Sequence, residues 1–131
     1  MDDINSMVFF CEDVREEIGS KQSYMGVIGP YLNISSFPFV FPKICVAGLV
    51  QAGIRDKVSV AIDLECIEGA IAFLPPPMAQ EVERAGDDPE WNVNVVLSLV
   101  QFTVQEPCVL HARLKVDEQL STCRLRIRGQ A

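Results

Sequence analysis

The chain of 131 residues has the length of one typical domain, and its content of 49% hydrophobic and 22% charged residues excludes intrinsic disorder. Its 11 Lys and Arg against 18 Asp and Glu give a net charge of −7, which argues against a general nucleic-acid binder. We therefore predict a single domain that spans residues 1–131.

Short apolar runs with the two-residue period of β-strands dominate the chain. Strands are predicted, in chain order, over residues 7–14, 22–28, 43–51, 57–65, 70–74, 91–105, 108–116 and 120–128. A Gly19-Ser20 turn is predicted between the first two. Residues 35–42 contain two prolines, which lack the N–H that a central strand donates, so an edge or crossover segment is expected there. Three phenylalanines of this segment are expected to point into the core: Phe37, Phe39 and Phe41.

Two local patterns differ from plain strands. After three consecutive prolines, the apolar residues of 78–86 recur at helical spacing and Gly86 suits a C-terminal cap, which predicts one short connecting helix. In the longest run the apolar phase changes at Leu99-Val100, which predicts a bulge or a strand that switches sheets. Seven or eight strands with one helix predict an all-β, antiparallel two-sheet sandwich of the immunoglobulin or C2 type.

The first third of the chain carries a recognisable pattern. Residues 10–17 read Phe-Cys-Glu-Asp-Val-Arg-Glu-Glu, followed by Gly-Ser-Lys at 19–21 and Ser-Tyr-Met-Gly at 23–26. Together with Phe-Pro-Lys at 41–43, this pattern resembles an uncharacterised family of short bacterial proteins that open with Phe-Cys-Asp-Asp-Ile-Arg-x-Glu and a Gly-Lys pair. The resemblance implies a small bacterial β-sandwich, a domain of unknown function, and supplies no catalytic residues.

The five cysteines lie far apart in the sequence, without a Cys-x-x-Cys spacing. The N-terminus is acidic and no apolar run is long enough for a membrane span. These features predict reduced cysteines in a cytoplasmic protein that does not interact with membranes. One histidine and isolated cysteines do not supply the clustered ligands of a zinc site, so we expect no metal and no cofactor.

Residues that could carry catalysis are few. His111 is the sole histidine, and its strand phase places it opposite the cysteines of the same hairpin, so no Cys–His dyad and no catalytic residue are predicted. One alternative is a small hydrolase or transferase that uses Cys11 or Asp13. Another is a Ca²⁺- or ligand-binding sandwich that uses the acidic segment 81–90.

The last two predicted strands carry the clearest constellation. A loop with an even number of residues puts their apolar side chains on one face, and a turn at Asp117-Glu118 satisfies this condition. The opposite face then collects His111, Arg113, Lys115, Arg124, Arg126 and Arg128. Like charges side by side reduce the stability of the fold unless something compensates them. Three sources of compensation are open: solvent and its counter-ions, an acidic surface such as segment 81–90 or a neighbouring subunit, and a nucleic-acid backbone.

From these observations we predict a non-enzymatic module that binds another macromolecule, either an acidic protein partner or a second copy of itself. The predicted contact residues are Arg113, Lys115, Arg124, Arg126 and His111. No aromatic residue is interleaved among them, which argues against single-stranded nucleic acid as the partner. The sequence identifies neither a small-molecule ligand nor a pathway.

Overall fold

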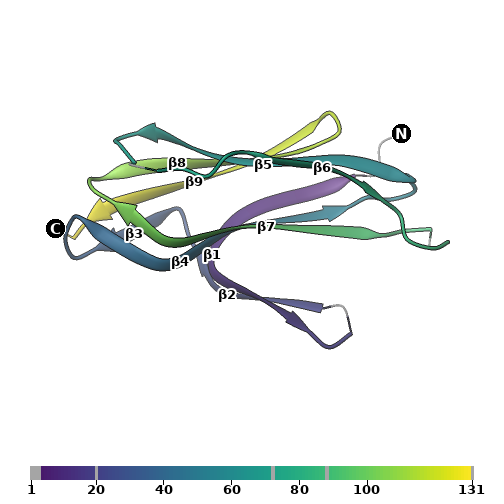
Figure 1. Cartoon of the computed structure of the whole chain (residues 1–131), viewed down its shortest axis with the longest axis horizontal. Coiled ribbons are helices and arrows are strands. Elements are labelled where there is room, and N and C mark those ends of the chain that lie inside the picture. Colours follow the sequence, from purple (N-terminus) through teal and green to yellow (C-terminus); the bar gives the residue numbers. More distant parts are fainter. Residues whose placement is uncertain (1–3, 20, 72, 88, 131) are drawn as a thin grey trace.

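The computed structural model describes residues 4–19, 21–71, 73–87 and 89–130, which form nine β-strands and no helix (Figure 1). The strands are β1 Asn5–Glu17, β2 Lys21–Ile28, β3 Tyr31–Ile34, β4 Phe39–Gln51, β5 Lys57–Glu68, β6 Met78–Glu83, β7 Asn92–Val104, β8 Cys108–Val116 and β9 Gln119–Gly129. The first sheet has the order β2-β1-β4-β7, and the second sheet has the order β3-β9-β8-β5-β6. All neighbouring strands are antiparallel except β3 and β9, which are parallel. The predicted all-β, two-sheet architecture is confirmed, and the immunoglobulin or C2 type stays a prediction.

The two sheets lie as two layers around one apolar core (Figure 1). In β5, Val58, Val60 and Ile62 are at most 2% exposed, and the residues between them point outward, as the sequence alternation predicts. Leu110 of β8 and Leu125 of β9 are completely buried. Burial of a side chain of this size stabilises the fold by roughly 1.5–3 kcal/mol, so this shared core holds the two layers together. None of the elements in the described ranges is a helix of the length and apolar character needed to cross a bilayer.

The segment predicted as a helix is instead strand β6, and this prediction was wrong. β6 pairs with β5, and Val82 lies opposite Val58. Met78 and Val82 are four residues apart, a spacing that fits two strand repeats as well as one helical turn. Pairing with β5 decides between them, because β6 satisfies backbone groups of β5 that would otherwise lie at an open edge.

The phenylalanine-rich segment enters a central strand, contrary to prediction. Pro42 lies inside β4, which runs between β1 and β7. The β1 ladder on β4 covers only residues 45–51, and the β7 ladder skips Pro42, opposite which Gln101 has a φ of 52°. A central strand therefore tolerates this proline because the ladder is interrupted where it stands. Three phenylalanines pack against the core as predicted: Phe37, Phe39 and Phe41.

A phase change in β7 is confirmed, but it lies at Gln101 and not at Leu99-Val100, since Val100 still follows the first phase. Leu99 is buried, Val100 is 69% exposed, and Phe102 is buried again, with the left-handed residue Gln101 between them. β7 stays paired with β4 on both sides of this point, so the phase change is a local irregularity and β7 does not switch sheets.

Three further connections differ from prediction or lie partly outside the described residues. Residues 70, 71, 73 and 74 have no strand structure, and the three prolines that follow them lack the N–H groups a ladder needs. Tyr31–Ile34 forms β3, which is too short to show a period in the sequence. At the predicted Gly19-Ser20 turn, Gly19 has a φ of 84°, whereas Ser20 lies outside the described residues, as does the acidic N-terminus at 1–3.

Candidate interaction surface

The hairpin of β8 and β9 has the predicted register. A two-residue turn at Asp117-Glu118 joins the strands, and His111 lies opposite Arg124. Leu110 and Leu125 lie opposite each other and point into the core. The outer face of the second sheet therefore carries six basic residues, here named the cationic strip: His111, Arg113, Lys115, Arg124, Arg126 and Arg128.

The tip of this hairpin is fixed to the start of β5. Asp117 has a φ of 50°, and one of its carboxylate oxygens accepts a hydrogen bond from the Ser59 N–H at 2.9 Å. The other carboxylate oxygen forms an ion pair with Arg55. In addition, the Asp117 N–H donates to the Ser59 carbonyl oxygen at 2.8 Å. These contacts hold the end of the cationic strip in place.

Carboxylates of β5, the strand beside β8, form ion pairs with half of the residues in the strip. Asp63 lies opposite Arg113 and accepts hydrogen bonds from its Nε at 2.9 Å and its Nη2 at 2.7 Å. These hydrogen bonds raise the pKa of Arg113 above its ordinary value. Glu65 lies 3.6 Å from the same guanidinium and 3.7 Å from His111 Nδ1, and Glu68 accepts a hydrogen bond from Arg126 Nη2 at 3.0 Å.

The proximity of these carboxylates to the strip was not predicted from the sequence. Asp63 and Glu65 stand on the polar phase of their strand, which was the available signal. The alternation does not predict which strand lies beside β8, because strand order depends on packing between distant segments. Asp63 and Arg113 are 50 residues apart in the chain.

The other half of the strip has no carboxylate partner in the part of the chain that the structure describes. Arg128 donates from Nε to Asn33 Oδ1 at 2.7 Å, and its guanidinium lies 4.3 Å from the centre of the Tyr31 ring. Lys115 and Arg124 are exposed and form neither a hydrogen bond nor an ion pair through their side chains with described residues. The uncompensated positive charge therefore lies on β8 and β9, and the carboxylates lie on β5 and β6.

A shallow hollow of about 270 Å³ lies beside Lys115. Its lining is Ala61, Ile62, Asp63, Pro77, Arg113, Lys115 and Leu120. Leu120 is 61% exposed. The hollow combines the ammonium group of Lys115 and the Asp63–Arg113 ion pair with apolar walls.

The acidic segment 81–90 is not adjacent to the cationic strip. Glu81 and Glu83 lie on β6, and β5 stands between β6 and the hairpin. Glu81 lies 3.8 Å from Lys57, and Asp88 of this segment lies outside the described residues. Within the described ranges, no group of three or more His, Cys, Asp or Glu side chains is arranged to hold a metal ion. The intramolecular carboxylates near the strip therefore come from β5.

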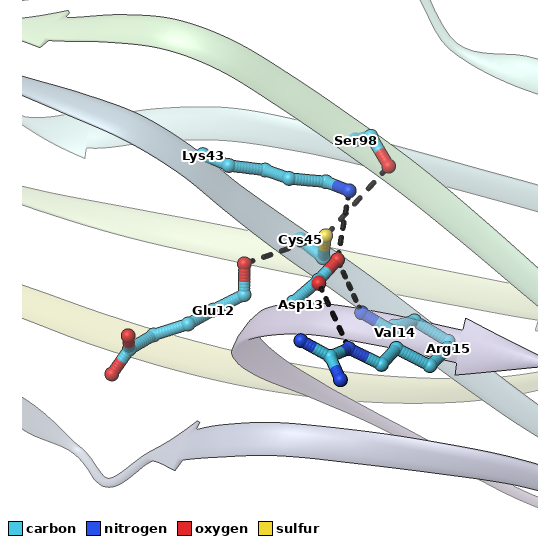
Figure 2. Close-up of polar contacts among 7 residues, drawn as sticks. All are labelled: Glu12, Asp13, Val14, Arg15, Lys43, Cys45 and Ser98. Atoms are coloured by element: carbon cyan, nitrogen blue, oxygen red, sulfur yellow. Dashed lines mark hydrogen bonds and ion pairs between the residues drawn. The ribbon is translucent and has the colours of Figure 1, made fainter.

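Asp13, named in the enzymatic alternative, is held in an ion pair where β1 and β4 diverge (Figure 2). Its Oδ1 accepts hydrogen bonds from Lys43 Nζ at 2.8 Å and from the Val14 N–H at 2.9 Å, and Arg15 Nε lies 3.7 Å from Oδ2. The hydrogen bond from Lys43 and that from Val14 lower the pKa of Asp13 below its ordinary value. Asp13 is therefore a carboxylate at neutral pH and has no proton to donate.

Cys11, the other residue of that alternative, is completely buried. It lies opposite Cys45 across β1 and β4, and both thiols are 0% exposed. Burial, together with the neighbouring Cys45, raises the pKa of Cys11 to about 11. Cys45 Sγ lies 3.7 Å from Ser98 Oγ and 4.0 Å from the carbonyl oxygen of Glu12 (Figure 2). Because the thiolate is the reactive species, this geometry disfavours Cys11 as a nucleophile.

Comparison with models of protein families identifies the family of this chain. A family model described as a family of unknown function (DUF6941) matches residues 6–128, which confirms the expectation of an uncharacterised domain family. No curated protein and no solved structure matches the chain.

Proposed function

Because the chain belongs to DUF6941, a family of unknown function, we propose a function from its own geometry: it is a non-enzymatic module that binds an acidic segment of a partner protein through the cationic strip. The observation that carries this proposal is the uncompensated charge of Lys115, Arg124 and Arg128 on the outer face of β8 and β9. A chain with a net charge of −7 gathers these cations on one face.

Electrostatics supports an acidic partner. Cations that lie side by side on one face repel one another, and this repulsion is relieved when carboxylates of another molecule approach. Local positive charge on an acidic protein also orients an incoming acidic segment before contact, which increases the association rate more than the final affinity. The acidic strands β5 and β6 on the same face would repel that segment and restrict it to the hairpin.

The proposed contact set is centred on Lys115 and Arg124. Arg113, Arg126 and His111 already lie against carboxylates of β5, so their contribution to a partner is reduced by competition within the sheet. The hollow beside Lys115 supports a contact in which a Glu or Asp of the partner reaches the ammonium group and its methylene groups lie against Leu120.

We also propose that this protein works in the cytoplasm. The five cysteines are free thiols, and three of them, Cys11, Cys45 and Cys108, are buried. Free thiols of this kind are typical of proteins in reducing compartments.

The test is binding of a fluorescently labelled, glutamate-rich peptide of about 20 residues, followed by fluorescence anisotropy at about 50 mM and about 500 mM salt. We expect saturable binding at low salt that weakens at high salt. The double variant Lys115→Glu with Arg124→Glu should bind at least tenfold more weakly, because two attractive contacts become repulsive.

The matched control is Arg15→Glu with Lys21→Glu, which changes the net charge equally at exposed basic residues of the other sheet. This control should bind the peptide within about twofold of the unmodified protein. Equal loss in both double variants would mean that net charge alone governs binding and would refute the proposed surface. Tighter binding of a 20-nucleotide single strand than of the peptide would refute a protein partner.

A further inference from the structure

Four strands lie at sheet edges, and three of them carry features that discourage pairing with another chain. The edges are β2 and β7 in the first sheet and β3 and β6 in the second. β2 carries Lys21 and the left-handed Gly26, β6 carries Glu81 and Glu83, and β3 has only four residues. Charges, irregular backbone and short length are the usual means by which an edge avoids pairing with a further strand.

β7 has none of the charge or length protection of the other edges. It is 13 residues long and reads Asn-Val-Asn-Val-Val-Leu-Ser-Leu-Val-Gln-Phe-Thr-Val, without a charged residue or a proline. Its pairing partner is β4 on one side, and no described strand pairs with its other side. The left-handed residue Gln101 is an irregularity near its end, which leaves residues 92–99 as a regular, uncharged edge.

An apolar hollow lies alongside the same edge. It has a volume of about 240 Å³ and is lined by Phe73, Pro75 and the consecutive residues 98–103 of β7. Consecutive residues of a strand point to opposite faces, so a hollow lined by all of them lies at the strand's edge. Phe73 is 73% exposed and Val100 is 69% exposed at this place. A strand added to β7 would cover both side chains.

We propose that β7 pairs with β7 of a second copy of this chain, so that the two first sheets join into one continuous sheet of eight strands. A two-fold axis makes this pairing antiparallel and places residues of one strand opposite residues of the same strand. An uncharged strand can meet itself without placing like charges opposite each other. The uncharged edge also lets two copies, each with a net charge of −7, meet without bringing charged side chains into the contact.

This pairing is tested by measuring the molar mass with light scattering in line with size exclusion, over micromolar to millimolar protein concentrations. We expect the unmodified protein to form a dimer at both about 50 mM and about 500 mM salt, because backbone pairing of an uncharged edge is not screened. Val100→Lys should raise the dimer dissociation constant at least tenfold, because each copy then brings a charge to the contact.

Val27→Lys is the matched control, since Val27 is a valine of similar exposure, 61%, on the other edge of the same sheet. It should leave the dimer unchanged. If Val100→Lys fails to fold, as judged by circular dichroism, Asn94→Lys at an exposed position of β7 takes its place. A monomer at all concentrations, a dimer that Val100→Lys and Asn94→Lys leave intact, or a dimer that dissociates only at high salt would overturn the proposal.

Discussion

The protonation of buried thiols links single residues to the stability of the fold. Cys11 and Cys108 have pKa values raised to about 11 and about 12, in both cases chiefly because burial disfavours the thiolate. Both residues lie where strands of one sheet meet, Cys11 between β2 and β4 and Cys108 at the start of β8. Ionisation at either place would put a charge into a region without solvent.

The pH dependence of stability follows from these values. Between pH 9 and about pH 11 the folded chain keeps protons on Cys11 and Cys108 that the unfolded chain releases, so the free energy of unfolding falls as pH rises. We expect a loss on the order of 2 kcal/mol for each buried thiol over this range. Urea unfolding at pH 8.5, 9.5 and 10.5 measures it, and Cys11→Ala should flatten the decline. A decline of equal slope in Cys11→Ala would contradict this origin.

At the scale of elements, two glycines with similar backbone angles differ in the space around them. Gly69 and Gly86 both have positive φ angles, 81° and 78°. A Cβ at Gly69 would lie 2.3 Å from the carbonyl oxygen of Pro107, whereas a Cβ at Gly86 would meet nothing within 4 Å. Gly69 thus lets the end of β5 pass close to the segment that leads into β8.

The substitution of each glycine by alanine should therefore have a different cost. Gly86→Ala should lower the free energy of unfolding by about 1 kcal/mol, because only the strained φ contributes. Gly69→Ala should lower it by at least about 3 kcal/mol, because rigid backbone must also move. Urea unfolding of both variants at one pH measures the difference. Equal losses would show that the close approach at Gly69 relaxes without cost.

Most elements were predictable because their side chains alternate clearly. The run from Val58 to Leu64 alternates without exception, and the hairpin register followed from the need to keep Leu110 and Leu125 on one face. β6 was mistaken for a helix because its apolar residues are four apart. Pro42 was excluded from a central strand by a rule that holds only where the ladder is complete on both sides.

At the scale of the whole molecule, the order of strands in each sheet could not be predicted from local sequence patterns. The cationic residues of the candidate site were identified in the sequence, but their neighbours were not, because Asp63 comes beside Arg113 only when β5 and β8 pair. The unprotected edge likewise became visible only after β7 was placed at the end of a sheet. Sequence alternation assigns residues to faces, and the strand order decides which faces and edges remain open.

The two proposed surfaces belong to different sheets, so their effects should separate. Lys115 and Arg124 lie on the outer face of the second sheet, and Val100 lies on an edge strand of the first. The double variant Lys115→Glu with Arg124→Glu should therefore remain dimeric but lose binding of the acidic peptide. Val100→Lys should be monomeric, and each chain should bind the peptide with unchanged affinity. Light scattering and anisotropy on the same samples measure both properties. Loss of both in either variant would show one shared surface or a disrupted fold, which circular dichroism distinguishes.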